Sequence, residues 1–377
     1  MKNVYYCTHS NLGDLSYGDS NNDNKFISAI PSEFNVVKIF PVRNKDNSVN
    51  IFSFLKLLLR IIFLATKKNQ IFVIRGTRLG IIPAFFKKVM KHTILLNVGC
   101  TPFSSIEKIA FSKNPSYKSK SNLLTKIFLK LDFQFEKFVI RHSTTLFVEN
   151  EIAGRIAKKY GGSSLNIVLL PYYVQDYFLT TKATNYNFSD GKPLIIGYTG
   201  RFHKYDKLEP LIDAVHILKN NGFPIILKLV GDGPTKKIIQ EKVNNYDLND
   251  NVYFLGSQPH RKVSEIIDME HLLILPMVKN ICPSTIPIKI VEGIIKGKII
   301  LTNKSGNIKS LFKPHTELVL DDFSDPKVIA DKIIEISKNF SYYQNFAQNL
   351  KKKHLKIRIK SYFENQIIKS TFSLLKR

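Results

Sequence analysis

Two basic residues in the second half of the chain could bind the phosphates of an anionic ligand. Arg201 and Lys207 lie in a loop, Gly200–Lys207, that follows a strand-like run and precedes a segment of helical length. A loop in this position can direct backbone amides, the amino terminus of a helix and two cations toward a diphosphate. Arg offers a planar fork and Lys a compact charge, and both suit phosphate oxygens. Two solvated cations on a surface loop are the alternative explanation.

Glycines mark two further turns at the ends of strand-like runs. Gly231 and Gly233 stand in the stretch VGDGP, which closes one run and opens a segment of helical length. Glycine permits a tight turn and the close approach of a ligand to the backbone. The next run, Val252–Ser257, contains Gly256, and its backbone could hydrogen-bond the edge of a base. A plain turn and an ordinary buried strand explain the same two stretches equally well.

A carboxylate, Glu292, is expected about one turn inside a helix that begins near Ile288. Pro283 and Pro287 place a loop before that helix. Lys289 would lie in the first turn, where a cation opposes the helix dipole unless an anion is present, so this placement indicates a bound phosphate. Glu292 can accept two hydrogen bonds from the vicinal hydroxyls of a ribose. A solvated Glu on a helix is the alternative for this residue taken alone.

Parallel sheets are expected to position these residues, because strand-like runs alternate with segments of helical length. The runs expected as strands are Asn3–Cys7, Val36–Ile39, Ile71–Ile74, Thr93–Val98 and Thr145–Val148 in the first half, and Leu194–Tyr198, Ile225–Val230, Val252–Leu255, Leu272–Leu275 and Ile299–Thr302 in the second. Such alternation predicts parallel strands joined by helical crossovers. A chain of 377 residues also exceeds what one core usually organises. We therefore expect an α/β protein with two Rossmann-like domains.

The order and spacing of the four stretches resemble the retaining, nucleotide-sugar-dependent GT-B glycosyltransferases of the family 4 type, the glycosyl transferases group 1. The resemblance covers about Ile195 to Gly306 and includes, in the family's order, GYTGRFHKYDKLEPL, LKLVGDGP, NVYFLGSQPH and IPIKIVEGIIKG. It implies the GT-B fold, in which two Rossmann-like domains face each other across a cleft. It also implies the transfer of a sugar, with retention of anomeric configuration, from a nucleotide-diphosphate donor to a saccharide acceptor.

The resemblance assigns roles to the candidate residues. Arg201 and Lys207 would be the catalytic pair that stabilises the leaving diphosphate, Glu292 would bind the ribose, and Tyr253–Ser257 would bind the base. The donor-binding set is Gly200, Gly231, Gly233, Tyr253, Phe254, Gly256, Ser257, Ser284, Ile288, Lys289 and Glu292. The leaving phosphate would help to deprotonate the acceptor, so no protein nucleophile is required. We expect no metal and no cofactor, because the nucleotide sugar is a substrate and no metal-ligand spacing is present.

The resemblance also implies a division of the chain into three parts. Residues 1–175 would form the acceptor-binding domain, residues 192–357 the nucleotide-sugar-binding domain, and residues 358–377 a helix that crosses back to the first domain. A polar loop, Asn11–Asn24, follows the first strand, and its Gly18 is a candidate for an acceptor or diphosphate loop. Asn and Gly are also ordinary turn formers, so a plain turn is an equal alternative.

Two positions near the transferred sugar depart from the family pattern. Ser284 stands eight positions before Glu292, where the family often has a Glu. The fourth strand is followed by Asn97–Thr101, where the family frequently has a His. Both departures concern the identity of the sugar and catalysis rather than donor binding. They keep two alternatives open, a GT-B-fold epimerase or phosphorylase and a catalytically silent partner subunit.

The charge of the chain predicts an anionic partner. The 56 basic and 30 acidic residues give a net charge of +26. Between Ile51 and Lys130, 15 Lys or Arg stand against one acid, Glu107, a local net charge of +14. Nucleic acid, acidic lipid and phosphorylated small molecules all attract such a chain. A nucleic-acid-binding protein is disfavoured, because the basic stretches lack RNA-binding aromatic motifs and DNA-reading helices.

An apolar helix within the basic stretch connects the charge to a membrane. Ile51–Lys68 is the most apolar segment, yet Lys56 and Arg60 interrupt it and it falls short of the roughly 20 apolar residues that a spanning helix needs. It is either a buried crossover helix, the more common case, or a helix on a membrane surface. A second basic and aromatic helix, Ala84–Lys91, favours the surface. We expect an anionic membrane surface as a partner and a lipid-linked acceptor of bacterial surface polysaccharide synthesis.

The cysteines and the amino terminus indicate the compartment. Cys7, Cys100 and Cys282 are widely separated and form neither a CxxC pair nor a disulfide-scaffold spacing, which fits a reduced environment. The first residues, MKNVYYC, read as a strand rather than as a signal peptide. The expected location is the cytoplasm, peripheral at the inner face of the cell membrane.

Overall fold

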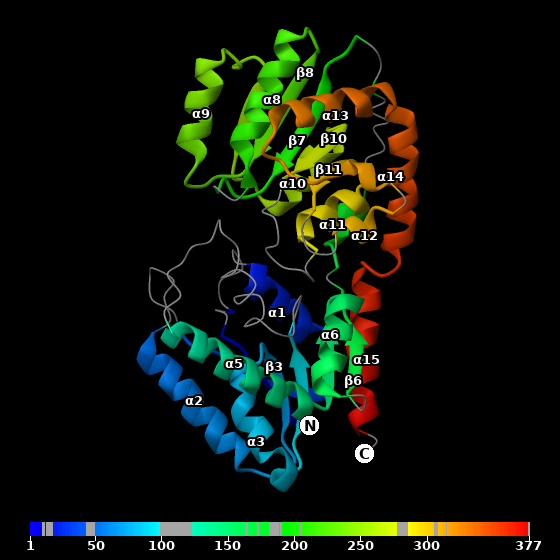
Figure 1. The fold of residues 1–377 in the computed structure, drawn as a ribbon. Coiled ribbons are helices and arrows are strands. Elements are labelled where there is room, and N and C mark those ends of the chain that lie inside the picture. Colours follow the sequence, from blue (N-terminus) through cyan, green and yellow to red (C-terminus); the bar gives the residue numbers. More distant parts are fainter. Residues whose placement is uncertain are drawn as a thin grey trace. The chain divides into compact units, whose positions relative to one another are not determined.

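The computed structural model of the chain contains two compact α/β units (Figure 1). Unit 1 comprises residues 1–172 and 361–377, and unit 2 comprises residues 173–360. The structure describes residues 1–9, 12, 18–42, 50–98, 123–162, 165–171, 173–180, 188, 191–203, 206–276, 286–304, 308–313 and 315–375.

Unit 1 is built on a six-stranded parallel sheet of order β2-β1-β3-β4-β5-β6. Its strands are β1 (Lys2–Cys7), β2 (Phe34–Ile39), β3 (Ile71–Arg75), β4 (Thr93–Asn97), β5 (Thr145–Val148) and β6 (Asn166–Leu169). Its helices are α1 (Gly18–Ser28), α2 (Ile51–Ala65), α3 (Ile81–Met90), α5 (Leu123–His142), α6 (Glu151–Gly161) and most of α15 (Lys360–Leu375), with a 3-10 turn, η1 (Arg78–Gly80). The side chains of Asn50 and Asn150 cap α2 and α6 by accepting hydrogen bonds from backbone amides in the first turns of these helices.

Unit 2 has a second six-stranded parallel sheet, of order β12-β11-β10-β7-β8-β9. Its strands are β7 (Leu194–Thr199), β8 (Ile225–Val230), β9 (Val252–Gly256), β10 (Leu272–Leu275), β11 (Ile299–Asn303) and β12 (Val319–Leu320). Its helices are α7 (Asp176–Leu179), α8 (Leu208–Asn220), α9 (Lys236–Asn245), α10 (His260–Asp268), α11 (Ile288–Ile295), α12 (Ile308–Leu311), α13 (Pro326–Lys338) and α14 (Phe340–Leu355), with a 3-10 turn, η4 (Thr316–Leu318). Strands β7, β8, β10 and β11 supply buried Ile, Leu and Val side chains to one continuous core.

The predicted α/β architecture is confirmed. Each of the ten runs expected as strands forms one, with ends that differ by at most two residues, and each sheet is parallel throughout. Strand β12 was not anticipated, because its two residues are too few to show a hydrophobic pattern. Helix α8 begins at Leu208, directly after a left-handed residue, Lys207.

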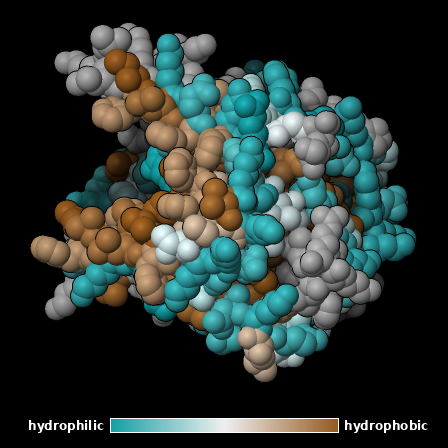
Figure 2. Space-filling model, turned by 90° about the horizontal axis from the view of Figure 1, so that it is seen from below, coloured by the Kyte–Doolittle hydropathy of each residue, from teal (hydrophilic) through white to brown (hydrophobic). Residues whose placement is uncertain are grey.

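Helix α2 differs from the buried crossover helix that was the more common alternative. One side of the helix is buried in the core of unit 1, through Leu57, Ile61, Leu64 and Ala65, but the opposite side is apolar and exposed. The exposed apolar residues of α2 are Ile51, Phe52, Leu55, Leu59, Ile62 and Phe63. Helix α2 packs on α3, and α3 on α5, and these neighbours expose Phe85, Val89, Ile127, Phe128, Leu131 and Phe135. In Figure 2, hydrophobic residues gather on one side of the face that it shows.

Among the helices that the structure describes, none combines the length and the apolar character required to cross a membrane.

Candidate active site

Backbone hydrogen bonds join the loop after β7 to the loop after β8. The amide of Gly200 donates to the carbonyl of Val230 (3.0 Å), and the amide of Phe202 donates to the carbonyl of Asp232 (2.9 Å). In return, the amide of Thr235 donates to the carbonyl of Phe202 (3.1 Å). Because both loops leave the carboxyl ends of neighbouring parallel strands, they lie where ligands bind in open α/β sheets.

The glycines of these loops allow the two backbones to touch. Gly231 has a φ of +139°, and a Cβ atom on it would lie 1.8 Å from the carbonyl oxygen of Gly200. A Cβ atom on Gly233 would lie 2.4 Å from the carbonyl oxygen of Phe202. The amide of Gly231 also donates to the carbonyl of Gly256 (2.9 Å), which adds the end of β9 to the same assembly. These glycines are therefore required for close protein packing, and not only for a turn.

Lys289 of α11 lies against the loop after β7. Helix α11 begins at Ile288, as the sequence predicts, so Lys289 is in its first turn. Its Nζ atom lies 3.5 Å from Oδ1 of Asp206 and 5.1 Å from the ring centroid of Tyr198, and a Cβ atom on Gly200 would lie 3.2 Å from it. Burial lowers the pKa of Lys289, and the carboxylate of Asp206 partly offsets this. The site thus holds a largely buried cation beside the loop that the sequence predicts to bind phosphates.

The two residues expected to act on the diphosphate have different surroundings. Nζ of Lys207 lies 2.7 Å from Oδ1 of Asp322 and also donates to Ser324. Lys207 has φ 45° and ψ 46°, in the left-handed region that non-glycine residues occupy at a cost of about 1–3 kcal/mol. The side chain of Arg201 is exposed. The only hydrogen bond between Arg201 and a side chain that the structure describes is made by its main-chain carbonyl, which accepts from the hydroxyl of Tyr198 (2.8 Å). Joint binding of a phosphate by these cations stays a prediction.

Glu292 is not the solvated helix residue of the alternative explanation, because it is only 4% exposed. Its Oε1 atom lies 2.7 Å from Nε2 of His260, the first residue of α10. Sequence reasoning missed His260, which is 32 residues away from Glu292 along the chain. The available signal is that His260 stands four residues after Gly256 and opens a helix, at the same edge of the sheet.

The remaining candidates of the donor-binding set differ in solvent exposure. Tyr253 is 45% exposed and its hydroxyl donates to the carbonyl of Asp250 (3.2 Å). Phe254 is half-buried, Ser257 is exposed, and Ile288 is 41% exposed.

Several candidates lie elsewhere or outside the described residues. Gly18 is the first residue of α1 in unit 1. Ser284 and residues 99–101, where the sequence departs from the family pattern, lie outside the described residues. Within the described ranges there is no group of three or more His, Cys, Asp or Glu residues that could hold a metal ion.

The second half of the chain matches a family model, and the chain is similar in sequence to several curated proteins. Residues 181–353 match the family model described as glycosyl transferases group 1. The chain is 26% identical over 202 residues to the putative glycosyltransferase EpsF of Bacillus subtilis, a match that covers 50% of this chain and 49% of that protein. It is 22% identical over 150 residues to the putative colanic acid biosynthesis glycosyltransferase WcaL of Salmonella typhimurium, covering 39% and 37%. The chain thus spans about half, or less, of the length of these curated relatives.

Solved structures match the fold over the whole chain. Sucrose-phosphate synthase from Thermosynechococcus elongatus superimposes with a TM-score of 0.70 at 13% identity and covers 100% of both chains. Anabaena Alr3699/HepE, solved in complex with UDP, superimposes with a TM-score of 0.65 at 12% identity over 99% of this chain and 100% of its own. The chain therefore carries a domain of the glycosyl transferases group 1 family, and its two parallel α/β sheets are those of the GT-B fold.

Proposed function

We propose that this protein is a retaining, metal-independent glycosyltransferase that moves a sugar from a nucleotide-diphosphate donor to a saccharide acceptor in bacterial surface polysaccharide synthesis. The observation that carries the proposal is the meeting, in unit 2, of three strand ends, the cation of Lys289 and the buried carboxylate of Glu292. Support also comes from the family match and from the names of the relatives, one of which is described as a colanic acid biosynthesis glycosyltransferase.

In the proposed reaction, the protein stabilises the charge that develops on the leaving diphosphate. Lys289 and Arg201 would bind phosphate oxygens, and Lys207 would join them after leaving the carboxylate of Asp322. Preorganised cations in a partly desolvated site lower the energy of a transition state that gains negative charge. Glu292 would accept hydrogen bonds from the ribose, and the end of β9 would hold the base. The leaving phosphate would take the proton of the acceptor on the face where the donor departs.

The donor assignment can be tested with a panel of UDP-, GDP- and dTDP-sugars, scored by thermal shift and by slow donor hydrolysis. Arg201→Ala and Lys207→Ala should each weaken donor binding by about 1.5–3 kcal/mol, because removing one cation leaves phosphate charge uncompensated. Lys237→Ala, which removes an exposed Lys of α9, is the matched control. Wild-type donor affinity in both variants would refute the assignment, and a donor-sugar isomer as the product would identify an epimerase instead.

The proposed acceptor is a lipid-linked saccharide, reached by docking unit 1 on an anionic membrane. The exposed apolar residues of α2, α3 and α5 are interspersed with exposed basic residues: Lys56, Arg60, Lys67, Lys68, Lys88, Lys91 and Lys130. Apolar side chains can enter the interface between headgroups and acyl chains, and each basic side chain near an acidic bilayer contributes about 1 kcal/mol. This combination complements an anionic lipid surface better than an uncharged partner.

Liposome flotation with neutral and acidic lipids at low and high salt tests the docking. Binding should require acidic lipid and weaken as salt screens the attraction. Phe52→Asp and Leu59→Asp should reduce it, because they place a like charge in the apolar face, whereas Ile238→Asp, at an exposed position of α9 in unit 2, should leave it unchanged. Negligible binding to both kinds of vesicle would remove the membrane role and favour a soluble acceptor.

A further inference from the structure

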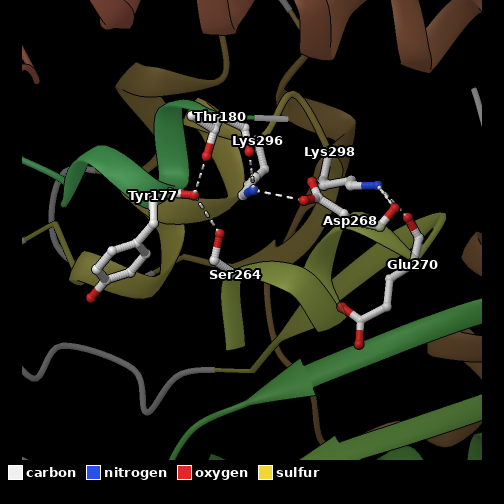
Figure 3. Close-up of polar contacts among 7 residues, drawn as sticks. All are labelled: Tyr177, Thr180, Ser264, Asp268, Glu270, Lys296 and Lys298. Carbon is white, nitrogen blue, oxygen red and sulfur yellow. Dashed lines mark hydrogen bonds and ion pairs between the residues drawn. The ribbon is translucent and has the colours of Figure 1, made fainter. Parts of the chain in front are cut away.

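Helix α7, a single turn just after the start of unit 2, is fixed to α10 and α11 by polar contacts (Figure 3). The carbonyl of Tyr177 accepts from Oγ of Ser264 in α10 (2.9 Å) and from Oγ1 of Thr180 (3.2 Å). The carbonyl of Thr180 accepts in turn from Nζ of Lys296 (3.4 Å), which follows α11 and pairs with Asp268 of α10 (2.8 Å). The position of α7 is therefore set by the two helices that carry His260 and Glu292.

Two side chains of α7 contact His260, which in turn contacts Glu292. The hydroxyl of Tyr177 lies 2.7 Å from Nδ1 of His260, and Nε2 of His260 lies 2.7 Å from Oε1 of Glu292. Phe178, which is fully buried, packs its ring 5.0 Å from the imidazole. His260 is thus held by an apolar ring and by a hydrogen bond at each nitrogen.

The direction of these hydrogen bonds follows from their chemistry. An ionised carboxylate only accepts, so Nε2 of His260 donates to Glu292. In the neutral imidazole Nδ1 then accepts, and the hydroxyl of Tyr177 donates to it. One neutral tautomer of His260 can therefore form both hydrogen bonds, the one with Tyr177 and the one with Glu292. The bond to His260 occupies one oxygen of Glu292 and restricts rotation of its carboxylate.

We propose that Tyr177 and His260 are positioning residues that orient Glu292 for the ribose of the donor, so that the segment entering unit 2 is part of the nucleotide-recognition apparatus. This inference rests on the proposed ribose-binding role of Glu292. A carboxylate held in one orientation binds a diol with a smaller loss of side-chain freedom than a free one. A ligand that lacks one ribose hydroxyl makes fewer hydrogen bonds to the carboxylate, so the fixed orientation increases its affinity less. His260 and Tyr177 should therefore affect the discrimination between ribo- and deoxyribonucleotides.

The test measures, by isothermal titration calorimetry on the full chain, the affinities for UDP and GDP and for their 2′-deoxy counterparts. Wild type should prefer the ribonucleotide, and Glu292→Gln should abolish that preference. His260→Ala should weaken binding of the ribonucleotide about tenfold and change binding of the deoxynucleotide little, the loss expected for one or two hydrogen bonds. His260→Gln, whose amide can donate to Glu292, should restore most of the preference. Tyr177→Phe should lower it about threefold.

The matched control is Tyr342→Phe, which removes a hydroxyl from a second tyrosine–histidine contact of unit 2, 3.2 Å from Nδ1 of His315. It should leave the preference unchanged. If Glu292→Gln abolishes the preference while His260→Ala and Tyr177→Phe keep it, the positioning role is wrong and the proposed function stands. If Glu292→Gln itself keeps the preference, the ribose-binding role of Glu292 is wrong, and the positioning role fails with it. Because Tyr177→Phe removes only one hydroxyl, it should fold even if His260→Ala does not.

Discussion

A buried carboxyl group in unit 2 should make the stability of this domain fall as the pH rises. Glu270, just before β10, is fully buried, and its carboxyl rests on the backbone of Gly197 in β7, where a Cβ atom would lie 2.0 Å from it. Neither carboxyl oxygen has a hydrogen-bond partner within the described part of the chain. Nearby, Lys298 donates to the main-chain carbonyl of Glu270 (2.7 Å) (Figure 3). Burial raises the pKa of Glu270 to about 8, against a partial offset by Lys228 and Lys298.

The sign and size of the effect follow from proton linkage. In the folded chain Glu270 keeps its proton up to about pH 8, whereas in the unfolded chain it loses the proton above its ordinary pKa of 4.5. Between these values the folded state binds one more proton, so the free energy of unfolding falls by about 1.4 kcal/mol per pH unit. By pH 7 the loss is about 3 kcal/mol. Glu270→Gln has no such titration, so the free energy of unfolding of the variant should increase relative to that of wild type as the pH rises from 5 to 8.

Hydrogen exchange of peptides from β7 and β10 is a suitable assay, because it reports the opening free energy of unit 2 separately from that of unit 1. His271 has a pKa that burial lowers to about 4, and since it is present in both proteins its contribution cancels in their difference. Glu241→Gln, at a carboxylate that is 61% exposed, is the control and should show no pH-dependent difference. A constant difference between Glu270→Gln and wild type from pH 5 to pH 8 would refute the reasoning.

Three further outcomes are expected. Gly231→Ala should destabilise unit 2 by more than about 2 kcal/mol in urea denaturation, because its Cβ would collide with the carbonyl of Gly200; wild-type stability would contradict the packing role. Lys296→Met should cost about 3–5 kcal/mol in the same assay, because it removes the ion-pair partner of the largely buried carboxylate of Asp268. Lys296→Met/Asp268→Leu should regain most of that loss, and equal stability of the single and double variants would argue against a coupled pair. Asp322→Asn should tighten UDP binding about two- to fivefold in calorimetry by releasing Lys207 from its ion pair; unchanged affinity would show that this pair does not compete with the nucleotide.

The strands could be predicted from the sequence because their signal is local. Runs such as Ile225–Val230 and Leu272–Leu275 are short, apolar and rich in branched residues, and these properties decide between strand and helix without knowledge of the partner strand. The start of α11 was predictable for a similar reason, since Pro287 limits where a helix can begin. Order and approximate boundaries of the elements therefore followed from the residues alone.

The contacts that complete the candidate site could not be predicted in this way. Lys207 and Asp322 are 115 positions apart, and nothing near either residue indicates the other. The pairing of His260 with Glu292 depends on how α10 and α11 lie at one edge of the sheet, which local patterns do not determine. The exposed side of α2 has the same composition as a buried one, so the sequence of this helix alone did not distinguish a buried crossover helix from a helix with an exposed apolar side.

Two cations of the proposed phosphate site, Lys207 and Lys289, are already paired with carboxylates, and this bears on which ligands the site would select. Lys289 faces Asp206 and Lys207 faces Asp322, so an incoming anion has to compete with a carboxylate for each of them. A singly charged ligand would exchange one such ion pair for another and gain little. In the proposed site, a nucleoside diphosphate would reach more than one cation at once while its ribose contacted Glu292, so each added interaction would cost less entropy than the first. The pairing should therefore favour a nucleoside diphosphate over inorganic phosphate by more than the difference in charge alone.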